Sequence, residues 1–183
     1  MTSPSSSHSQ PRHKYLLVII VAVVTIVIDQ ISKHLILQSF RPGEILPVIP
    51  GLFNLTLTFN FGAAFGLWSN LPPGWREFAL GASITVALSV LFYFLKQSGQ
   101  RSSLSQVSLA AVLGGALGNV LDRMQHGYVI DFLDAYWGNY HWPAFNIADS
   151  AIVVGVAIVV LGPQHTPTSN HTPTTSDESP KIG

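Results

Sequence analysis

The sequence predicts an all-α membrane protein with four transmembrane helices and a small sheet on the extracytoplasmic side. Of its 183 residues, 48% are hydrophobic and only 10% are charged, which is too apolar for an ordinary soluble protein. Four segments also approach the roughly 20 apolar residues that a helix needs to cross a bilayer. Residues 1–14 and 163–183 are rich in Ser, Thr, Pro and His, so we expect two disordered tails flanking one membrane domain, residues 15–162.

The four predicted spans follow from apolar length. The first could be mistaken for a cleaved signal peptide, but it continues past Ile28 without a small-x-small cleavage site, so we interpret it as a permanent helix. The spans are Tyr15–Leu37, Trp75–Leu95, Ser103–Asp122 and Asn146–Leu161.

An even number of spans places both tails on one side of the membrane. Five basic residues lie on the tail side and four on the other. Lys33 and Arg123 each have an acidic partner nearby, and discounting them leaves five against two. The positive-inside rule then predicts cytoplasmic tails.

Two longer segments are expected on the opposite side. Within residues 38–74, the stretch 51–60 alternates apolar with polar or small residues, which is typical of a half-buried strand and predicts a small sheet at the outer membrane face. We interpret the second segment, 123–145, as a loop. The aromatic residues suited to an interfacial belt are Phe61, Phe65, Trp68 and Trp75.

Two aspartates, Asp131 and Asp149, stand in short polar segments at helix boundaries. Ionisable side chains near hydrocarbon are costly, so both are functional candidates. For Asp149 a local explanation stays open, because Asn146 could cap the fourth helix while the positive helix end stabilises the carboxylate. The loop carrying Asp131, however, is short enough to fold back onto this helix. We expect a third carboxyl group, Asp134, to face solvent.

A carboxyl pair at about 3 Å shares one proton. The ionised partner takes a proton from water while the protonated one polarises a peptide carbonyl, which is aspartyl-protease chemistry. If the loop brings Asp131 beside Asp149, as its length allows, the two form a catalytic dyad.

The first helix carries Asp29 and Lys33 four residues apart. They share a helix face, and we interpret them as a structural ion pair. On the third helix Gly115, Asn119 and Asp122 form one stripe.

Gly114 and Gly118 form a small-xxx-small pair that lets another helix approach closely. This approach is expected to bring a polar group of that helix against Asn119. Asp122 and Arg123 are expected to organise the loop that carries Asp131.

Several classes of function have little support. The net charge is zero without a Lys/Arg cluster, so nucleic acid is not an expected partner. The chain lacks cysteine, which excludes disulfides and thiolate sites, and its core histidines lack HExxH-type spacing, so no metal site is predicted. Ser32 and Lys33 point about 100° apart on a helix and cannot form a serine–lysine pair.

Two alternatives stay open. A small proton-coupled transporter or channel would also place Asp and Lys within a membrane, although four helices without an evident inverted repeat make a poor alternating-access machine. A structural membrane scaffold would tolerate loss of either aspartate.

Five motifs resemble, in order, those of the bacterial lipoprotein signal peptidases, the type II signal peptidases. They cover nearly the whole core, and each is weak alone while the set is highly specific. The third motif has Val120-Leu121 where a Leu-Ile pair is commoner, an exchange of apolar for apolar. The motifs are Asp29-Gln30-x-x-Lys33, Asn60-x-Gly62-x-Ala64-Phe65, Gly115-x-x-Gly118-Asn119-x-x-Asp122-Arg123, Val129-x-Asp131-Phe132 and Phe145-Asn146-x-Ala148-Asp149.

The resemblance implies a four-helix aspartyl peptidase of the bacterial cytoplasmic (inner) membrane, with both termini cytoplasmic and an extracytoplasmic β-cradle at about residues 38–74. It implies cleavage of diacylglyceryl-modified prolipoproteins before the lipidated cysteine, without a cofactor, by a monomer in contact with membrane lipid. By motif, Asp131 and Asp149 resemble the catalytic dyad, near the extracytoplasmic face. The residues resembling its supporting and substrate-binding shell are Asn60, Gly115, Asn119, Asp122, Arg123, Val129, Asn146 and Ala148.

Overall fold

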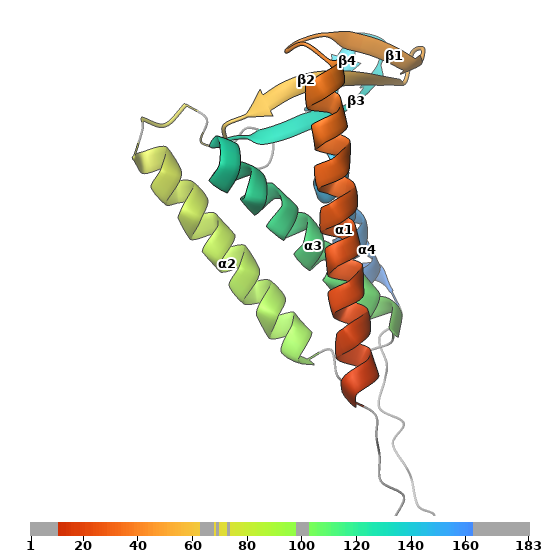
Figure 1. Cartoon of the computed structure of the whole chain (residues 1–183), viewed down its shortest axis with the longest axis vertical. Coiled ribbons are helices and arrows are strands. Elements are labelled where there is room, and N and C mark those ends of the chain that lie inside the picture. Colours follow the sequence, from red (N-terminus) through yellow and green to blue (C-terminus); the bar gives the residue numbers. More distant parts are fainter. Residues whose placement is uncertain (1–10, 63–67, 69, 73, 98–102, 163–183) are drawn as a thin grey trace, which may run out of the picture.

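The computed structural model describes residues 11–62, 68, 70–72, 74–97 and 103–162. Within these residues α3 lies between α2 on one side and α1 with α4 on the other, and a sheet covers one end of the helices (Figure 1). The elements in chain order are α1 (Pro11–Ser39), β1 (Ile45–Ile49), β2 (Phe53–Asn60), α2 (Trp75–Gln97), α3 (Ser103–His126), β3 (Val129–Trp137), β4 (Tyr140–His141) and α4 (Ile147–Leu161).

The helix bounds differ from the predicted spans mainly at the ends. α1 begins four residues earlier than predicted, at Pro11, and α3 continues to His126. Asp122 and Arg123 therefore lie within the last turns of α3 and not at its end. Residues 98–102 of the predicted turn between α2 and α3, and most of both predicted tails, lie outside the described residues.

The sheet is antiparallel with the strand order β1-β2-β3-β4. β2 confirms the strand predicted at 51–60. The loop predicted for 123–145 is wrong, since this segment contains β3 and β4. The first four residues of β3 are all buried, so β3 lacks the apolar–polar alternation by which a half-buried strand is recognised. Buried Ile36, Leu57, Ile130 and Phe132 join the end of α1 to the sheet.

Glycines let α3 approach its neighbours closely, as predicted. A Cβ atom at Gly114 would stand 2.6 Å from the carbonyl oxygen of Ala22 on α1, and one at Gly118 would stand 2.7 Å from Asp29 Oδ2. A Cβ at Gly115 would overlap the carbonyl oxygen of Ala148 on α4. These contacts bring the polar side chains of α1, α3 and α4 within hydrogen-bonding distance.

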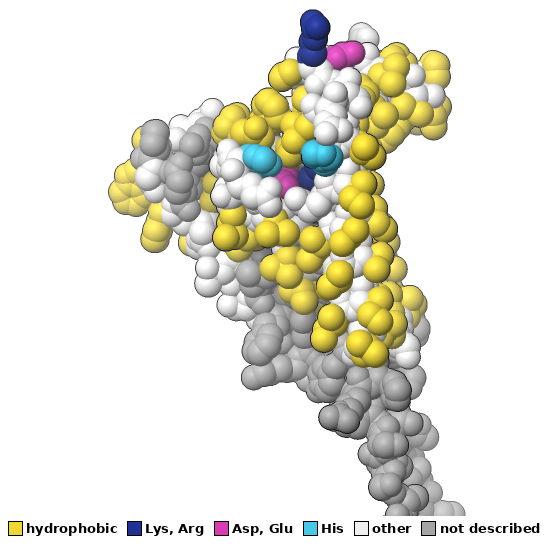
Figure 2. Space-filling view, viewed as in Figure 1, with side chains coloured by type: hydrophobic (Ala, Val, Ile, Leu, Met, Phe, Trp, Pro, Cys, Tyr) yellow, Lys and Arg dark blue, Asp and Glu magenta, His cyan; other side chains and the backbone are white. Residues whose placement is uncertain are grey.

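Two described helices, Leu16–Ser39 of α1 and Ser103–His126 of α3, are long and apolar enough to cross a membrane. α4 is apolar but has only 15 residues, about 22 Å of helix, which is shorter than a typical hydrocarbon core. Hydrophobic side chains cover much of the visible face of α1 and the edge of the sheet at β1 (Figure 2). On α1 the exposed fractions of Ile19, Val23, Ile31 and Leu35 lie between 51% and 59%.

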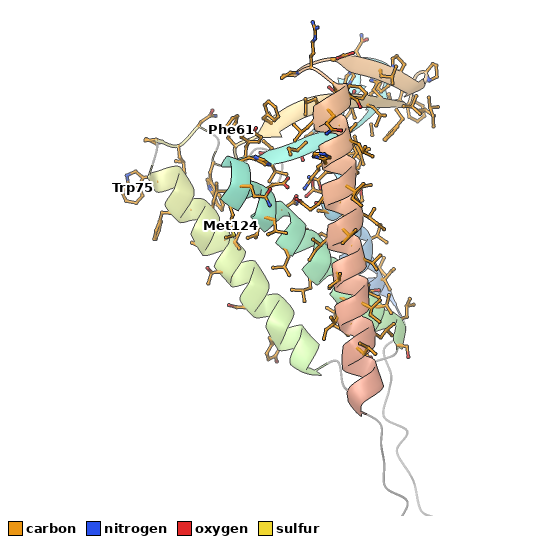
Figure 3. The ribbon with its side chains drawn as sticks, in the orientation of Figure 1. Phe61, Trp75 and Met124 are labelled. Atoms are coloured by element: carbon orange, nitrogen blue, oxygen red, sulfur yellow. The ribbon has the colours of Figure 1, made fainter. Side chains whose placement is uncertain are left out.

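Large apolar side chains are also exposed near the sheet. Phe61, directly after β2, and Trp75, at the start of α2, lie at the sheet end of the molecule (Figure 3). Their exposed fractions are 44% and 68%, consistent with an interfacial position. Phe65, which was predicted for the same belt, lies outside the described residues.

Candidate active site

A buried lysine connects α1 to α3. Lys33 is 1% exposed, and its ammonium group lies 2.8 Å from Asp29 Oδ2 and 2.8 Å from Asp122 Oδ2. It also donates a hydrogen bond to Asn119 Oδ1 at 3.0 Å. An ammonium group has three donors, so each has an acceptor here. The predicted Asp29–Lys33 pair is confirmed, and it is part of a larger network.

The two carboxylates of this network extend it to α4 and β3. Asp29 Oδ1 accepts from the backbone N–H of Ala148 at 2.9 Å, in the first turn of α4. Asp122 Oδ1 accepts from Gln30 Nε2 at 2.7 Å, and Asp122 Oδ2 accepts from the Ile130 N–H at 3.1 Å. Since Ile130 directly precedes Asp131, this hydrogen bond connects Asp122 to the segment that carries Asp131, which is consistent with the organising role predicted for Asp122.

The orientation of the Asn119 amide follows from its partners. Its Oδ1 accepts from Lys33 and, at 3.2 Å, from Asn146 Nδ2. Its Nδ2 is thereby directed to Asp149 Oδ1, to which it donates at 2.8 Å. The predicted contact between Asn119 and a polar group of another helix is confirmed. Lys33 thus acts on Asp149 through Asn119.

Asn146 joins the two aspartates through one side chain. It caps α4, because its Oδ1 accepts from the Asp149 N–H at 2.9 Å while its own N–H donates to Asp149 Oδ2 at 3.3 Å. This is the capping box of a helix N-terminus, and it confirms the predicted cap. The Nδ2 of Asn146 donates to Asp131 Oδ1 at 2.7 Å.

Asp131 lies on β3 and not in a loop, and it is 2% exposed. Its second oxygen, Oδ2, accepts from Asn60 Nδ2 at 3.0 Å. The Asn60 amide is itself oriented, because its Oδ1 accepts from the Gly62 N–H at 2.9 Å. Each oxygen of Asp131 therefore has one amide donor.

Burial, and next the neighbouring Asp149 carboxylate, raise the pKa of Asp131, which reaches about 7 in the folded protein. The hydrogen bonds from Asn60 and Asn146 and the charge of Lys33 act in the opposite sense and lower it. An acid with a pKa near neutrality can hold and release a proton at physiological pH.

Arg123 borders the same site from α3. Its Nη1 donates to the Asn119 carbonyl at 3.1 Å, and its Nη2 donates to the Gly62 carbonyl at 2.6 Å. Its Nε is buried and has no hydrogen-bond partner among the described residues. Arg123 thereby connects the segment directly after β2 to α3.

A cavity of about 740 Å³ opens beside Asp149. It lies between α2, α3, α4 and residues 142–145, and Asn60, Arg123 and Val129 also border it. Most of its lining is apolar, including Leu80 and Ile84 of α2. The polar residues thus border an otherwise apolar space, as in many sites for largely apolar ligands.

The remaining predicted positions lie at close contacts around the site. Gly115 and Ala148 form the close contact between α3 and α4, and Val129 is buried at the start of β3, where it borders the cavity. Ala64 and Phe65 of the second motif lie outside the described residues. Among the described residues, no group of three or more His, Asp or Glu side chains could hold a metal ion.

The expectation that Asp134 faces solvent is wrong. It is 7% exposed and accepts from Asn54 Nδ2 at 2.8 Å. His141 Nδ1 lies 2.9 Å and 3.0 Å from its two oxygens. No local pattern indicates this cluster, because Asn54 is 80 residues from Asp134 and lies beside it only through the pairing of β2 with β3.

Comparisons with known proteins identify the family. The model of the signal peptidase (SPase) II family matches residues 21–162. The lipoprotein signal peptidase of Alteromonas mediterranea is 44% identical over 141 residues, covering 77% of this chain and 76% of that protein. The lipoprotein signal peptidase of Syntrophotalea carbinolica is 40% identical over 148 residues, covering 81% of this chain and 91% of that protein.

Two solved structures are similar to this chain in both fold and sequence. Two structures, each described as a bacterial membrane enzyme structure by the in meso method, have TM-scores of 0.66 and 0.67 to this chain at 34% and 33% identity. Both cover 79% of this chain, and it covers 85% and 90% of theirs. The family match and the similar structures indicate a membrane-located protease. The chain belongs to the signal peptidase II family, the lipoprotein signal peptidases, and this membership supports cleavage of signal peptides from prolipoproteins.

Proposed function

We propose that the chain is an aspartic endopeptidase that cleaves diacylglyceryl-modified prolipoproteins before the lipidated cysteine, with Asp131 and Asp149 as its catalytic pair. The observation that carries this proposal is the bridge made by Asn146, whose side chain contacts Asp131 Oδ1 and the Asp149 N–H. One residue thereby fixes both carboxyl groups relative to each other.

The surroundings of the two carboxyl groups support different roles for them in this proposal. Asp149 lies in the first turn of α4 and accepts from Asn119 and from a backbone N–H, and a positive helix end favours an ionised carboxylate. Asp131 has a raised pKa of about 7 because it is buried beside Asp149. Asp149 is therefore the base, and Asp131 is the acid.

In the reaction, Asp149 takes a proton from water as the oxygen of that water attacks the carbonyl carbon of the scissile peptide. Asp131 gives its proton to the carbonyl oxygen, which forms a neutral tetrahedral diol. Collapse of the diol breaks the C–N bond, the proton on Asp149 passes to the leaving nitrogen, and a diol proton returns to Asp131. The cycle restores one shared proton and uses water as its only co-reactant.

The supporting residues have distinct tasks in this proposal. Asn60, Asn119 and Asn146 orient the carboxyl groups, and the Lys33 network fixes Asn119. Arg123 borders the cavity, and its guanidinium group suits a carbonyl group of the bound peptide. The apolar cavity lining suits a lipidated substrate that is itself held in the bilayer.

The membrane arrangement is part of the proposal. The four helices act as four transmembrane segments of the bacterial inner membrane, with both tails cytoplasmic and the sheet at the extracytoplasmic face. Exposed apolar side chains on α1 and β1 support contact with lipid. The short α4 begins at the buried site, where the bilayer boundary would lie. The chain acts as a monomer.

The test is cleavage of a lipidated prolipoprotein by the purified protein in detergent. We expect cleavage before the lipidated cysteine by the wild type and none by Asp131→Asn or Asp149→Asn, with both variants still folded. Proton flux through reconstituted protein without proteolysis would instead support a transporter. Full activity in both variants would remove the dyad from the mechanism.

A further inference from the structure

The sheet contains a buried carboxylate that the proposed reaction does not use. Asp134 on β3 is 7% exposed and stands between Asn54 on β2, at 2.8 Å, and His141 on β4, at 2.9 Å. A buried carboxylate costs free energy unless hydrogen bonds compensate it. Both oxygens of Asp134 have partners, so the three residues form one satisfied cluster, which we name the clasp.

The imidazole of His141 is held from a second direction. It stacks on the Tyr136 ring, with centroids 4.9 Å apart and planes 7° apart. The Tyr136 hydroxyl in turn accepts from the Gly51 N–H at 2.7 Å, in the turn between β1 and β2. β4 has only two residues, and so short a strand contributes little stability of its own. The clasp and the ring stacking therefore contribute more to holding His141 than the backbone hydrogen bonds between β3 and β4 do.

The residues after His141 form one side of the cavity. Trp142, Pro143, Ala144 and Phe145 all line it, and we name this segment the wall. The Trp142 N–H donates to the Ala135 carbonyl at 2.8 Å, and the Phe145 N–H donates to the Leu133 carbonyl at 3.0 Å. The wall thus begins at the clasp and ends immediately before Asn146.

We propose that Asn54, Asp134 and His141 are positioning residues that hold the wall in place for the apolar part of the bound lipidated peptide. The identity of this ligand rests on the proposed function. The clasp acts on binding and not on the chemical step, because Asp131 and Asp149 take their side-chain hydrogen bonds from Asn60, Asn119 and Asn146.

The test compares His141→Ala and Asn54→Ala with the control His34→Ala. His34 is an exposed histidine on α1 whose ring contacts Gln38, so its removal leaves the wall untouched. The side chain of His141 is 48% exposed, and its truncation leaves the hydrophobic core intact. We expect both clasp variants to raise KM for a lipidated prolipoprotein peptide about three- to tenfold, as for one or two lost hydrogen bonds, with kcat within about twofold of wild type.

His141→Asn retains a donor near the position of Nδ1 and is expected to return KM toward the wild-type value. A lower kcat at unchanged KM, or clasp variants that behave like His34→Ala, would overturn the proposal. Binding gives an independent measurement, since a fluorescent lipidated peptide can be titrated into Asp149→Asn with and without His141→Ala. If the wild type does not cleave but the clasp still changes the Kd, the proposed function fails and the positioning role stands.

Discussion

Replacing Asn60 by Ala tests the assignment of Asp131 as the acid. Asn60 Nδ2 donates to Asp131 Oδ2 at 3.0 Å, and this bond lowers the pKa of Asp131 because it favours the ionised form. The substitution removes that donor, so the pKa of Asp131 must rise from its value of about 7.

The size of the rise follows from the strength of the bond. A hydrogen bond to a charged group contributes about 1.5 to 3 kcal/mol, and one pKa unit corresponds to about 1.4 kcal/mol. Water entering the space left by the side chain restores part of the loss, so we expect a shift of about one unit. An acid acts while protonated, so activity is present below its pKa and is lost as pH rises through it. The alkaline limb of the profile should therefore move from about pH 7 to about pH 8.

The assay is the pH dependence of kcat/KM for a lipidated prolipoprotein peptide in detergent. The matched control is Asn54→Ala, which changes the same residue type on the same strand but contacts Asp134. We expect this control to leave the limb in place. Activity that increases through pH 7 in the wild type would reverse the roles of the two aspartates. If the alkaline limb of the kcat/KM profile stays at the same pH in Asn60→Ala, that limb does not report the ionisation of Asp131.

Three further predictions concern stability and packing. Lys33→Met leaves two buried carboxylates without their cation, and it should cost about 3 to 5 kcal/mol in denaturant unfolding. Gly115→Ala forces α3 and α4 apart and should lower the thermal unfolding midpoint, whereas Gly81→Ala, which meets nothing within 4 Å, should stabilise by up to about 1 kcal/mol. Asp131→Asn removes a carboxyl group whose pKa rises from 3.8 to about 7 on folding. The free energy of unfolding of the wild type should therefore fall by up to about 4 kcal/mol as pH rises through that window, and Asp131→Asn should lack this fall. Equal slopes of unfolding free energy against pH in the two proteins would contradict this prediction.

The helices and β2 were predictable because each has a local pattern. Apolar length marked the spans, and alternation marked residues 51–60. β3 was not predicted because its first four residues, Asp131 included, are all buried, so its polar residues do not alternate with apolar ones. Without that alternation a short segment cannot be distinguished from a loop by its sequence.

The residues of the candidate site were predictable from the sequence, but most of the hydrogen bonds between them were not. Periodicity paired Asp29 with Lys33, and capping rules paired Asn146 with Asp149, because these partners are three or four residues apart. The bond from Lys33 to Asn119 spans 86 residues, and the cluster around Asp134 depends on a strand pairing that no local pattern reports. Contacts between residues so far apart in the sequence can be identified only once the fold is known.

The Lys33 network explains why the aspartate pair can hold a proton. Lys33 forms ion pairs with Asp29 and Asp122, and its hydrogen-bonded connection to Asp149 passes through the neutral amide of Asn119. A cation in direct contact with Asp131 or Asp149 would stabilise the ionised form and make the pair a salt bridge without acidic function. The three asparagines instead fix the geometry of the carboxyl groups without adding charge. The site therefore retains an acid near neutral pH because burial and the Asp149 carboxylate raise the pKa of Asp131, while the ammonium group of Lys33 is already paired with two other carboxylates.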